Sequence, residues 1–104
     1  MTKKKLMTLT KLRSDKALNR VVRLARKEKS FTYILFVSPW DKTSQVALDY
    51  VQGLDTNHEV FTLDYFDAPQ SWGQFKVQPG TLVKINDKKV VVYPGRQAIK
   101  LELN

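Results

Sequence analysis

The feature of this sequence that most constrains its fold is the run Phe31–Val37, in which every side chain is apolar, aromatic or β-branched. A run of this length and composition is typical of a strand buried on both faces, and such strands lie centrally in sheets that helices cover. Ser38-Pro39 ends the run, because proline has no N–H to donate to a neighbouring strand. The pattern therefore predicts a central strand followed by an exposed loop that carries Trp40. Open α/β sheets bind ligands at this carboxyl end of their strands.

Helical spacing on both sides of this strand, and further short apolar runs, predict that helices and strands alternate along the whole chain. Gly53 is expected to end the helix after the loop in a left-handed conformation. The other expected strands are residues 6–12, 59–66, 81–85 and 89–93, and the last two form a hairpin. The expected helices are residues 16–29 and 43–54, with a helical or irregular turn at 67–75 and at most a short final helix at 96–104.

The net charge of +8 is concentrated at one end of the chain. Residues 1–30 hold 11 Lys or Arg and 2 acidic residues, whereas residues 31–104 hold 7 Lys or Arg and 8 acidic residues. A length of 104 residues suits one domain, so we expect a flexible basic N-terminus at residues 1–5 and a single domain at 6–104. A localised basic surface attracts anionic partners, whereas an even spread of charge would indicate only solubility.

Most of this charge falls on one face of the first expected helix. At about 100° per residue, apolar residues such as Leu18 and Ala25 share the side that is expected to pack on the sheet. The opposite side carries Arg13, Lys16, Arg20, Arg23, Arg26 and Lys27. Nucleic acid, an acidic protein or an anionic membrane surface would each suit such a face, and the sequence leaves these alternatives open. Because residues 1–30 contain no aromatic side chain, a nucleic-acid interpretation extends only to phosphate contacts without sequence readout.

Several kinds of chemistry are excluded by what the sequence lacks. It contains no cysteine, and therefore no disulfide, thiolate metal site or redox pair of its own. Its one histidine, His58, has no cysteine or histidine companion for zinc, and its four glycines form no phosphate-binding loop. We therefore expect no catalytic residues, no metal and no cofactor, and the chain is not expected to be an enzyme. No apolar segment of signal or membrane-spanning type is present, so a cytoplasmic location is expected.

The segment around Trp40 resembles the thioredoxin family. A buried strand that runs into Trp-Cys-x-x-Cys and then a helix is the pattern of that family, and residues 40–44 occupy the same register. Asp41 and Ser44 stand where the two cysteines would be. Two further similarities are the Thr81-Leu82 strand start, with residues 75–77 shortly before it, and Gly95 after the hairpin.

The resemblance implies an α/β, thioredoxin-like fold with a central mixed sheet of four to five strands, helices on both faces and a short C-terminal helix. One departure concerns the loop before Thr81. The family places a cis-proline directly before this threonine, whereas here Gly80 precedes it and Pro79 lies one position earlier. The sequence leaves open whether the Gln78–Pro79 bond is cis.

A partner groove at the carboxyl end of the central strand is also implied, because thioredoxins receive an extended peptide of their partner there. Tryptophan is over-represented at binding hot spots, although packing within the chain is the alternative for both tryptophans. Asp41 and Ser44 are expected to cap the following helix rather than act as acid and nucleophile, since His58 is predicted at the other end of that helix. The predicted groove consists of Trp40, Asp41, Ser44, Trp72 and Pro79.

Two hypotheses for the function follow. The first is a non-catalytic thioredoxin-like binding module that acts as a protein-interaction, structural or regulatory subunit of a larger assembly. The alternative is a small basic nucleic-acid-binding protein whose first long helix makes sequence-independent phosphate contacts. A protein partner is expected in the first case and a nucleic acid or other polyanion in the second. The sequence predicts neither the partner's identity nor the oligomeric state.

Overall fold

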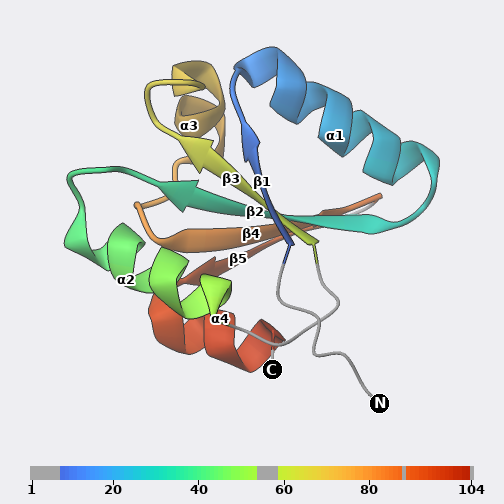
Figure 1. Cartoon of the computed structure of the whole chain (residues 1–104). Helices are drawn as coiled ribbons and strands as arrows, with labels where there is room; N and C mark the ends of the chain where they lie inside the picture. Colours follow the sequence, from blue (N-terminus) through green and yellow to red (C-terminus); the bar gives the residue numbers. More distant parts are fainter. Residues whose placement is uncertain (1–7, 54–58, 88, 104) are drawn as a thin grey trace.

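One five-stranded mixed sheet forms the centre of the molecule in the computed structural model, which describes residues 8–53, 59–87 and 89–103 (Figure 1). The strand order is β1-β3-β2-β4-β5. The three strands on one side, β1, β3 and β2, run parallel, whereas β4 and β5 are antiparallel to their neighbours. The strands are β1 (Thr8–Leu12), β2 (Phe31–Val37), β3 (Glu59–Asp64), β4 (Thr81–Asn86) and β5 (Val90–Pro94). The predicted central strand and the predicted hairpin are thereby confirmed.

Two helices cover each face of this sheet (Figure 1). The helices are α1 (Asp15–Lys27), α2 (Lys42–Gln52), α3 (Pro69–Phe75) and α4 (Gly95–Leu103). α1 and α3 lie on one face, and α2 and α4 lie on the other. The final helix is short, as expected, but it still places Ile99 and Leu103 in the core against α2 and the sheet.

Alternation along β2 divides the core into two layers. Tyr33 and Leu35 point into the layer shared with α2 and α4, whereas Ile34 and Phe36 point into the layer shared with α1 and α3. Both layers exclude solvent from β2, because Ile34, Leu35 and Phe36 are 0% exposed. This is the arrangement that a strand of apolar, aromatic and β-branched side chains needs, and it holds the end of β2 in place.

The first helix is fixed at its start by two acceptors. Ser14 Oγ accepts a hydrogen bond from Ala17 N at 3.0 Å, which is a standard N-cap. Asp15 then reaches across to α3, where its Oδ1 accepts from Ser71 N at 2.7 Å and from Ser71 Oγ at 2.6 Å. α3 has no side-chain cap of its own, so Asp15 supplies it from the neighbouring helix. Burial would raise the pKa of Asp15, but the hydrogen bonds from Ser71 and Gln70 outweigh burial and lower the pKa.

Two local expectations were wrong. β3 was expected to continue to residue 66, but it ends at Asp64, whose Oδ1 accepts a hydrogen bond from Phe66 N at 2.9 Å. This contact turns the chain away from the sheet, because an aspartate that bonds two residues ahead forms a turn of its own. Gly53 follows α2 with φ −84°, an ordinary right-handed value, so it does not end that helix in the expected left-handed conformation. The expected flexible segment at 1–5 and the loop with His58 lie outside the described residues.

Candidate functional site

The carboxyl ends of β2 and β3 meet the start of β4 at one edge of the sheet. Phe36 pairs with Thr81 across β2 and β4, and Phe36 pairs with Leu63 across β2 and β3. The loops that leave this edge, residues 38–41, 65–68 and 76–80, therefore lie close together in space. We call this region the carboxyl edge, and it is where the sequence predicted a groove.

Ser44 secures the loop after β2. Its Oγ accepts a hydrogen bond from Ser38 N at 2.9 Å and donates to the Ser38 carbonyl oxygen at 2.7 Å. We call this pair of bonds the Ser38–Ser44 latch. Ser44 is 0% exposed, so its hydroxyl already has its partners and no surface contact is open to it. Its position in the first turn of α2 makes it part of the support beneath the carboxyl edge.

Asp41 is the N-cap of α2, as expected from the sequence. Its Oδ1 accepts a hydrogen bond from Ser44 N at 3.2 Å. The Asp41 N–H in turn donates to the Ser38 carbonyl oxygen at 3.2 Å, which closes a tight turn around Pro39 and Trp40. Asp41 and Ser44 thus both use their side chains to hydrogen-bond backbone groups of the loop and the first turn of α2. The Ser44 hydroxyl donates to backbone carbonyl oxygens, of Ser38 at 2.7 Å and of Asp41 at 3.2 Å, and not to the Asp41 carboxylate, so the two side chains are not arranged as nucleophile and base.

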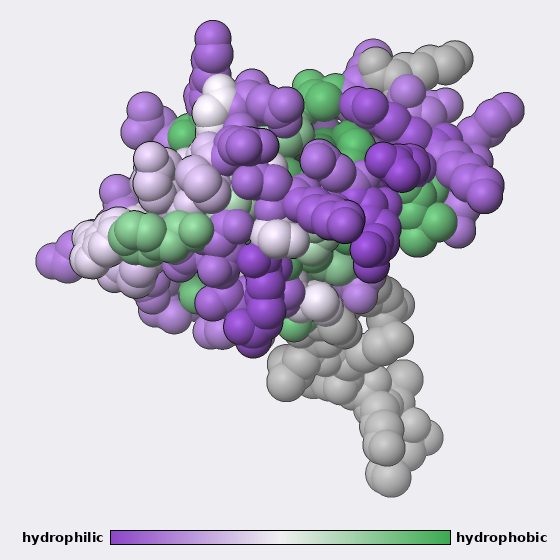
Figure 2. Space-filling view, turned by 90° about the horizontal axis from the view of Figure 1, so that it is seen from above, coloured by the Kyte–Doolittle hydropathy of each residue, from purple (hydrophilic) through white to green (hydrophobic). Residues whose placement is uncertain are grey.

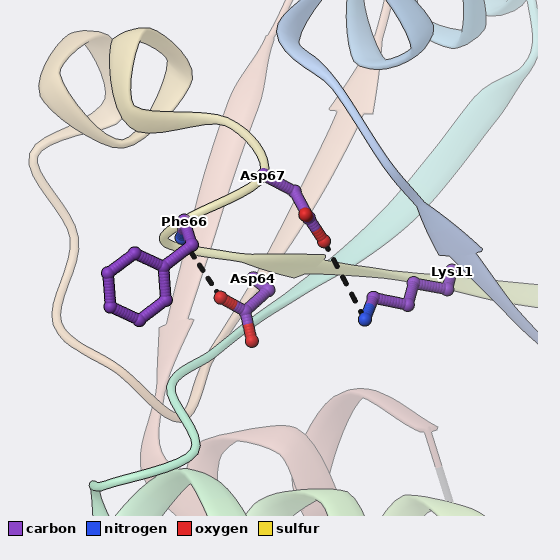
Figure 3. A network of polar contacts seen from close by, with 4 residues as sticks. All are labelled: Lys11, Asp64, Phe66 and Asp67. Atoms are coloured by element: carbon purple, nitrogen blue, oxygen red, sulfur yellow. Dashed lines mark hydrogen bonds and ion pairs between the residues drawn. The ribbon is translucent and has the colours of Figure 1, made fainter.

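Three exposed aromatic rings gather at the carboxyl edge. Trp40 is 70% exposed, and its ring meets that of Phe66 edge to face, with centroids 4.5 Å apart. Phe66 and Tyr65, exposed by 61% and 46%, are also edge to face, at 6.0 Å. Figure 3 shows the Phe66 ring pointing away from the Lys11–Asp67 ion pair on the other side of its turn. We call Trp40, Tyr65 and Phe66 the edge aromatics.

Tyr65 and Phe66 were missed by the sequence analysis, which placed them in a mostly buried strand. Apolar residues at the end of a strand pattern look the same whether the strand continues or turns. The available signal was the pair Asp64 and Asp67 on either side of them, because aspartate favours turns and is rare in buried strands. Their exposure follows from the Asp64 turn described above.

Trp72 lies beneath this surface rather than on it. It is 7% exposed and packs edge to face between Tyr65, at 5.5 Å, and Phe36, at 5.2 Å. Rings in contact therefore run without a break from Phe36 in the core, through Trp72, Tyr65 and Phe66, to Trp40 at the surface. The sequence left open whether each tryptophan is exposed in the groove or packed within the chain. Trp72 is packed within the chain, and Trp40 is exposed. The edge aromatics consequently rest on the core rather than on a free loop.

The loop before β4 approaches α2 closely. Gly80 has φ +84°, and its N–H donates to the Phe36 carbonyl oxygen at 2.7 Å. A Cβ on Gly80 would lie 3.0 Å from the Thr43 carbonyl oxygen, so any other residue would be both strained and crowded here. Pro79 beside it is half-buried, and the Gln78–Pro79 bond is trans. Proline offers no N–H, so a partner backbone finds no donor at this position.

A separate polar cluster lies between the sheet and α4. Tyr33 Oη donates to Glu102 Oε2 at 2.6 Å, and Lys84 Nζ lies 3.2 Å from the same oxygen. Burial alone would raise the pKa of Glu102, but hydrogen bonds from Tyr33, Lys84 and Tyr93, with the Lys84 charge, lower it below its ordinary 4.5. Burial, and then the bond to Glu102, raise the pKa of Tyr33. The cluster has satisfied polar groups and joins β2, β4, β5 and α4.

The predicted basic face lies along the outer side of α1. Lys16, Arg20, Arg23, Arg26 and Lys27 are all exposed, while Leu18 and Ala25 on the opposite side are buried. Figure 2 looks onto the face of the molecule that α1 and α3 cover, and hydrophilic residues occupy much of it. This face contains no aromatic side chain from α1, and its residues differ from the edge aromatics, which lie on the loops after β2 and β3.

Two absences can be stated for the described residues. No group of three or more His, Asp or Glu residues within 8–53, 59–87 and 89–103 could hold a metal ion. Among the helices of that same part of the chain, none is long and apolar enough to cross a membrane.

Comparison with solved structures identifies the fold. The chain is similar to thioredoxin NaTrxh from Nicotiana alata, with a TM-score of 0.78, 13% identity, and coverage of 98% of this chain and 93% of the other. It is also similar to thioredoxin from Trypanosoma brucei brucei, with a TM-score of 0.73, 10% identity and coverage of 97% and 90%. For Fasciola hepatica thioredoxin the TM-score is 0.71, the identity 18% and the coverage 89% and 92%.

These likenesses confirm the predicted architecture over nearly the whole chain. No protein-family model matches the sequence, and no curated protein matches it. The chain therefore has the α/β thioredoxin-like fold, which the structural likeness shows without showing an activity. Because the sequence contains no cysteine, thiol–disulfide exchange by this chain is excluded.

Proposed function

We propose that this chain is a non-catalytic binding module, in which the carboxyl edge binds a protein partner through the edge aromatics. Its place is that of a structural or regulatory subunit in a larger assembly. The observation that carries the proposal is the exposure of Trp40, Tyr65 and Phe66 together at the edge where the fold presents ligands. No other group of rings in the described structure combines such exposure with mutual contact.

The composition of this surface favours a protein partner. Large aromatic side chains bury much area and lose little rotamer freedom on binding, so tryptophan and tyrosine dominate interface hot spots. Contact with the buried Trp72 holds Tyr65 in position before a partner arrives, which reduces the entropy that binding costs. Half-buried carboxylates at Asp41 and Asp64 flank the rings and suit a partner segment that combines apolar with basic side chains.

The test is affinity capture from an extract of the producing cells, followed by binding measurements with the purified partner. Trp40→Ala and Phe66→Ala should each weaken binding about 30-fold or more, because a hot-spot truncation costs about 2 kcal/mol. Both side chains are mostly exposed, so their removal should leave the fold intact. Leu101→Ala is the matched control, because Leu101 is 85% exposed on α4.

The expected complex survives moderate salt, since apolar burial is not screened. A partner that binds the Trp40→Ala and Phe66→Ala variants as tightly as the wild-type chain would contradict the proposal. Loss of binding in the Leu101→Ala control would do the same, because it would place the interface on α4.

A further inference from the structure

Four cations form a straight row along the outer side of α1. Lys16, Arg20, Arg23 and Lys27 are spaced by four, three and four residues, which places them within an arc of about 60° at 100° per residue. The row spans about 16 Å along the helix axis, at 1.5 Å per residue. All four side chains are exposed. We call these four residues the cationic stripe.

The charges of the cationic stripe are not neutralised within the described structure. The ion pairs of that part of the chain are Lys11–Asp67 and Lys84–Glu102, and neither involves the stripe. Asp15, the one acidic residue of α1, is already bonded to Ser71. Like charges three or four residues apart destabilise a helix, and the stripe contains three such neighbouring pairs. An anionic ligand along the helix would relieve this repulsion.

The surroundings of the stripe select among anionic ligands. Protein interfaces and single-stranded nucleic acids both rely on aromatic side chains, and α1 contains none. Membrane-surface helices need an apolar face turned to the lipid, but the apolar face of α1 packs on the sheet and leaves only Leu24, at 54%, well exposed beside the stripe. Double-stranded DNA needs only a row of cations, because its backbone is a regular line of phosphates.

We propose that the cationic stripe binds the phosphate backbone of double-stranded DNA without reading its sequence. Double-stranded DNA carries one phosphate per about 1.7 Å of its axis when both strands are counted, so along about 16 Å its phosphates outnumber the four cations of the stripe. Two of the four cations are arginines, whose planar fork can bond two phosphate oxygens at once. The stripe lies on α1, whereas the edge aromatics lie on the loops after β2 and β3, so the DNA contact uses different residues from the proposed protein contact.

Salt dependence provides a quantitative test with purified full-length chain and a dye-labelled duplex of about 20 base pairs. Four neutralised phosphates predict a slope of about −3.6 for the logarithm of the binding constant against that of salt. Affinity measured by fluorescence anisotropy should therefore fall about 150-fold between 50 and 200 mM salt, and two unrelated duplex sequences should bind equally.

Charge reversal locates the surface. R20E/R23E should abolish measurable binding, whereas R96E/K100E, which changes the net charge equally on exposed positions of α4, should keep the steep slope. Circular dichroism establishes that both variants are folded. Should R20E/R23E not fold, R20Q/R23Q removes the same two charges, and the salt slope should change from about −3.6 to about −1.8.

Several results would overturn the proposal. One is a slope shallower than about −2 for the wild-type chain, and another is equal weakening by R96E/K100E. Tighter binding of poly-glutamate, of a single strand of the same length or of anionic lipid vesicles would assign the stripe to another partner class. None of these results bears on the edge aromatics, because the DNA assay contains no protein partner.

Discussion

Replacement of Ser44 by alanine should destabilise the fold although the change removes a single oxygen atom. Ser44 Oγ is the partner of both backbone groups of Ser38, and Ser38 itself is 7% exposed. The Ser38 carbonyl oxygen keeps its bond from Asp41 N, so the Ser38 N–H is the group left without a partner. Alanine restores no hydrogen bond, and the mutation therefore acts through a buried, unsatisfied donor.

The expected cost can be worked from these contacts. An orphaned buried donor costs about 1–3 kcal/mol, and the lost bond to the carbonyl oxygen adds about 0.5–1 kcal/mol. The higher helix propensity of alanine returns about 0.5 kcal/mol at most. The free energy of unfolding should fall by about 1–3.5 kcal/mol, which is a substantial share of the roughly 5–15 kcal/mol typical of a domain.

Urea denaturation followed by circular dichroism measures this change. With a slope of about 2 kcal/mol per molar urea, the midpoint should fall by about 0.5–1.8 M. Ser30→Ala is the control, because Ser30 is exposed and its hydroxyl makes one long bond of 3.4 Å, to the Ala25 carbonyl oxygen. If Ser44→Ala and Ser30→Ala shift the midpoint equally, the latch does not hold the loop and the reasoning fails.

Two further predictions concern other contacts. Gly80→Ala should lower the free energy of unfolding by about 2–4 kcal/mol, because alanine would be strained at φ +84° and its Cβ would meet Thr43. Gly73→Ala, in the open interior of α3, should instead raise it by about 0.5–1 kcal/mol, and thermal unfolding of the two variants distinguishes these signs. Glu102→Gln should cost about 2 kcal/mol at neutral pH. Because the folded-state pKa of Glu102 is lowered, ionised Glu102 stabilises the fold above its ordinary pKa of 4.5 and this stabilisation is lost as the pH falls through the lowered value. Urea midpoints of the wild-type chain and the Glu102→Gln variant should therefore converge in acid, and a constant difference across pH would contradict the assignment.

The architecture was predictable because its strongest signals are local. The unbroken apolar run of β2, the two-sided pattern of α1 and the β4–β5 hairpin are each visible within about a dozen residues. The resemblance around Trp40 then supplied the architecture, a mixed sheet with helices on both faces, which local patterns do not determine. Helix starts followed from capping residues, and both Ser14 and Asp41 cap as their side chains suggest.

The surface of the candidate site was less predictable, because exposure depends on contacts between distant segments. The two tryptophans carry the same sequence signal, yet Trp40 is 70% exposed and Trp72 is 7% exposed. Trp72 is buried because α3 places it on Phe36 from β2, a contact across 36 positions of the chain. The bond from Ser71 to Asp15 is also long-range, and no local pattern indicates it.

The Ser38–Ser44 latch has a consequence for how this chain could change over time. In the thioredoxin pattern that the sequence resembles, positions 41 and 44 belong to the two sulfur atoms of the reactive pair. Here the same positions cap α2 and close a buried turn. A cysteine at position 44 would offer only a weak donor and acceptor in place of the hydroxyl, so introducing a thiol here would weaken the fold. Position 44 therefore cannot support this turn fully and carry a reactive sulfur at the same time.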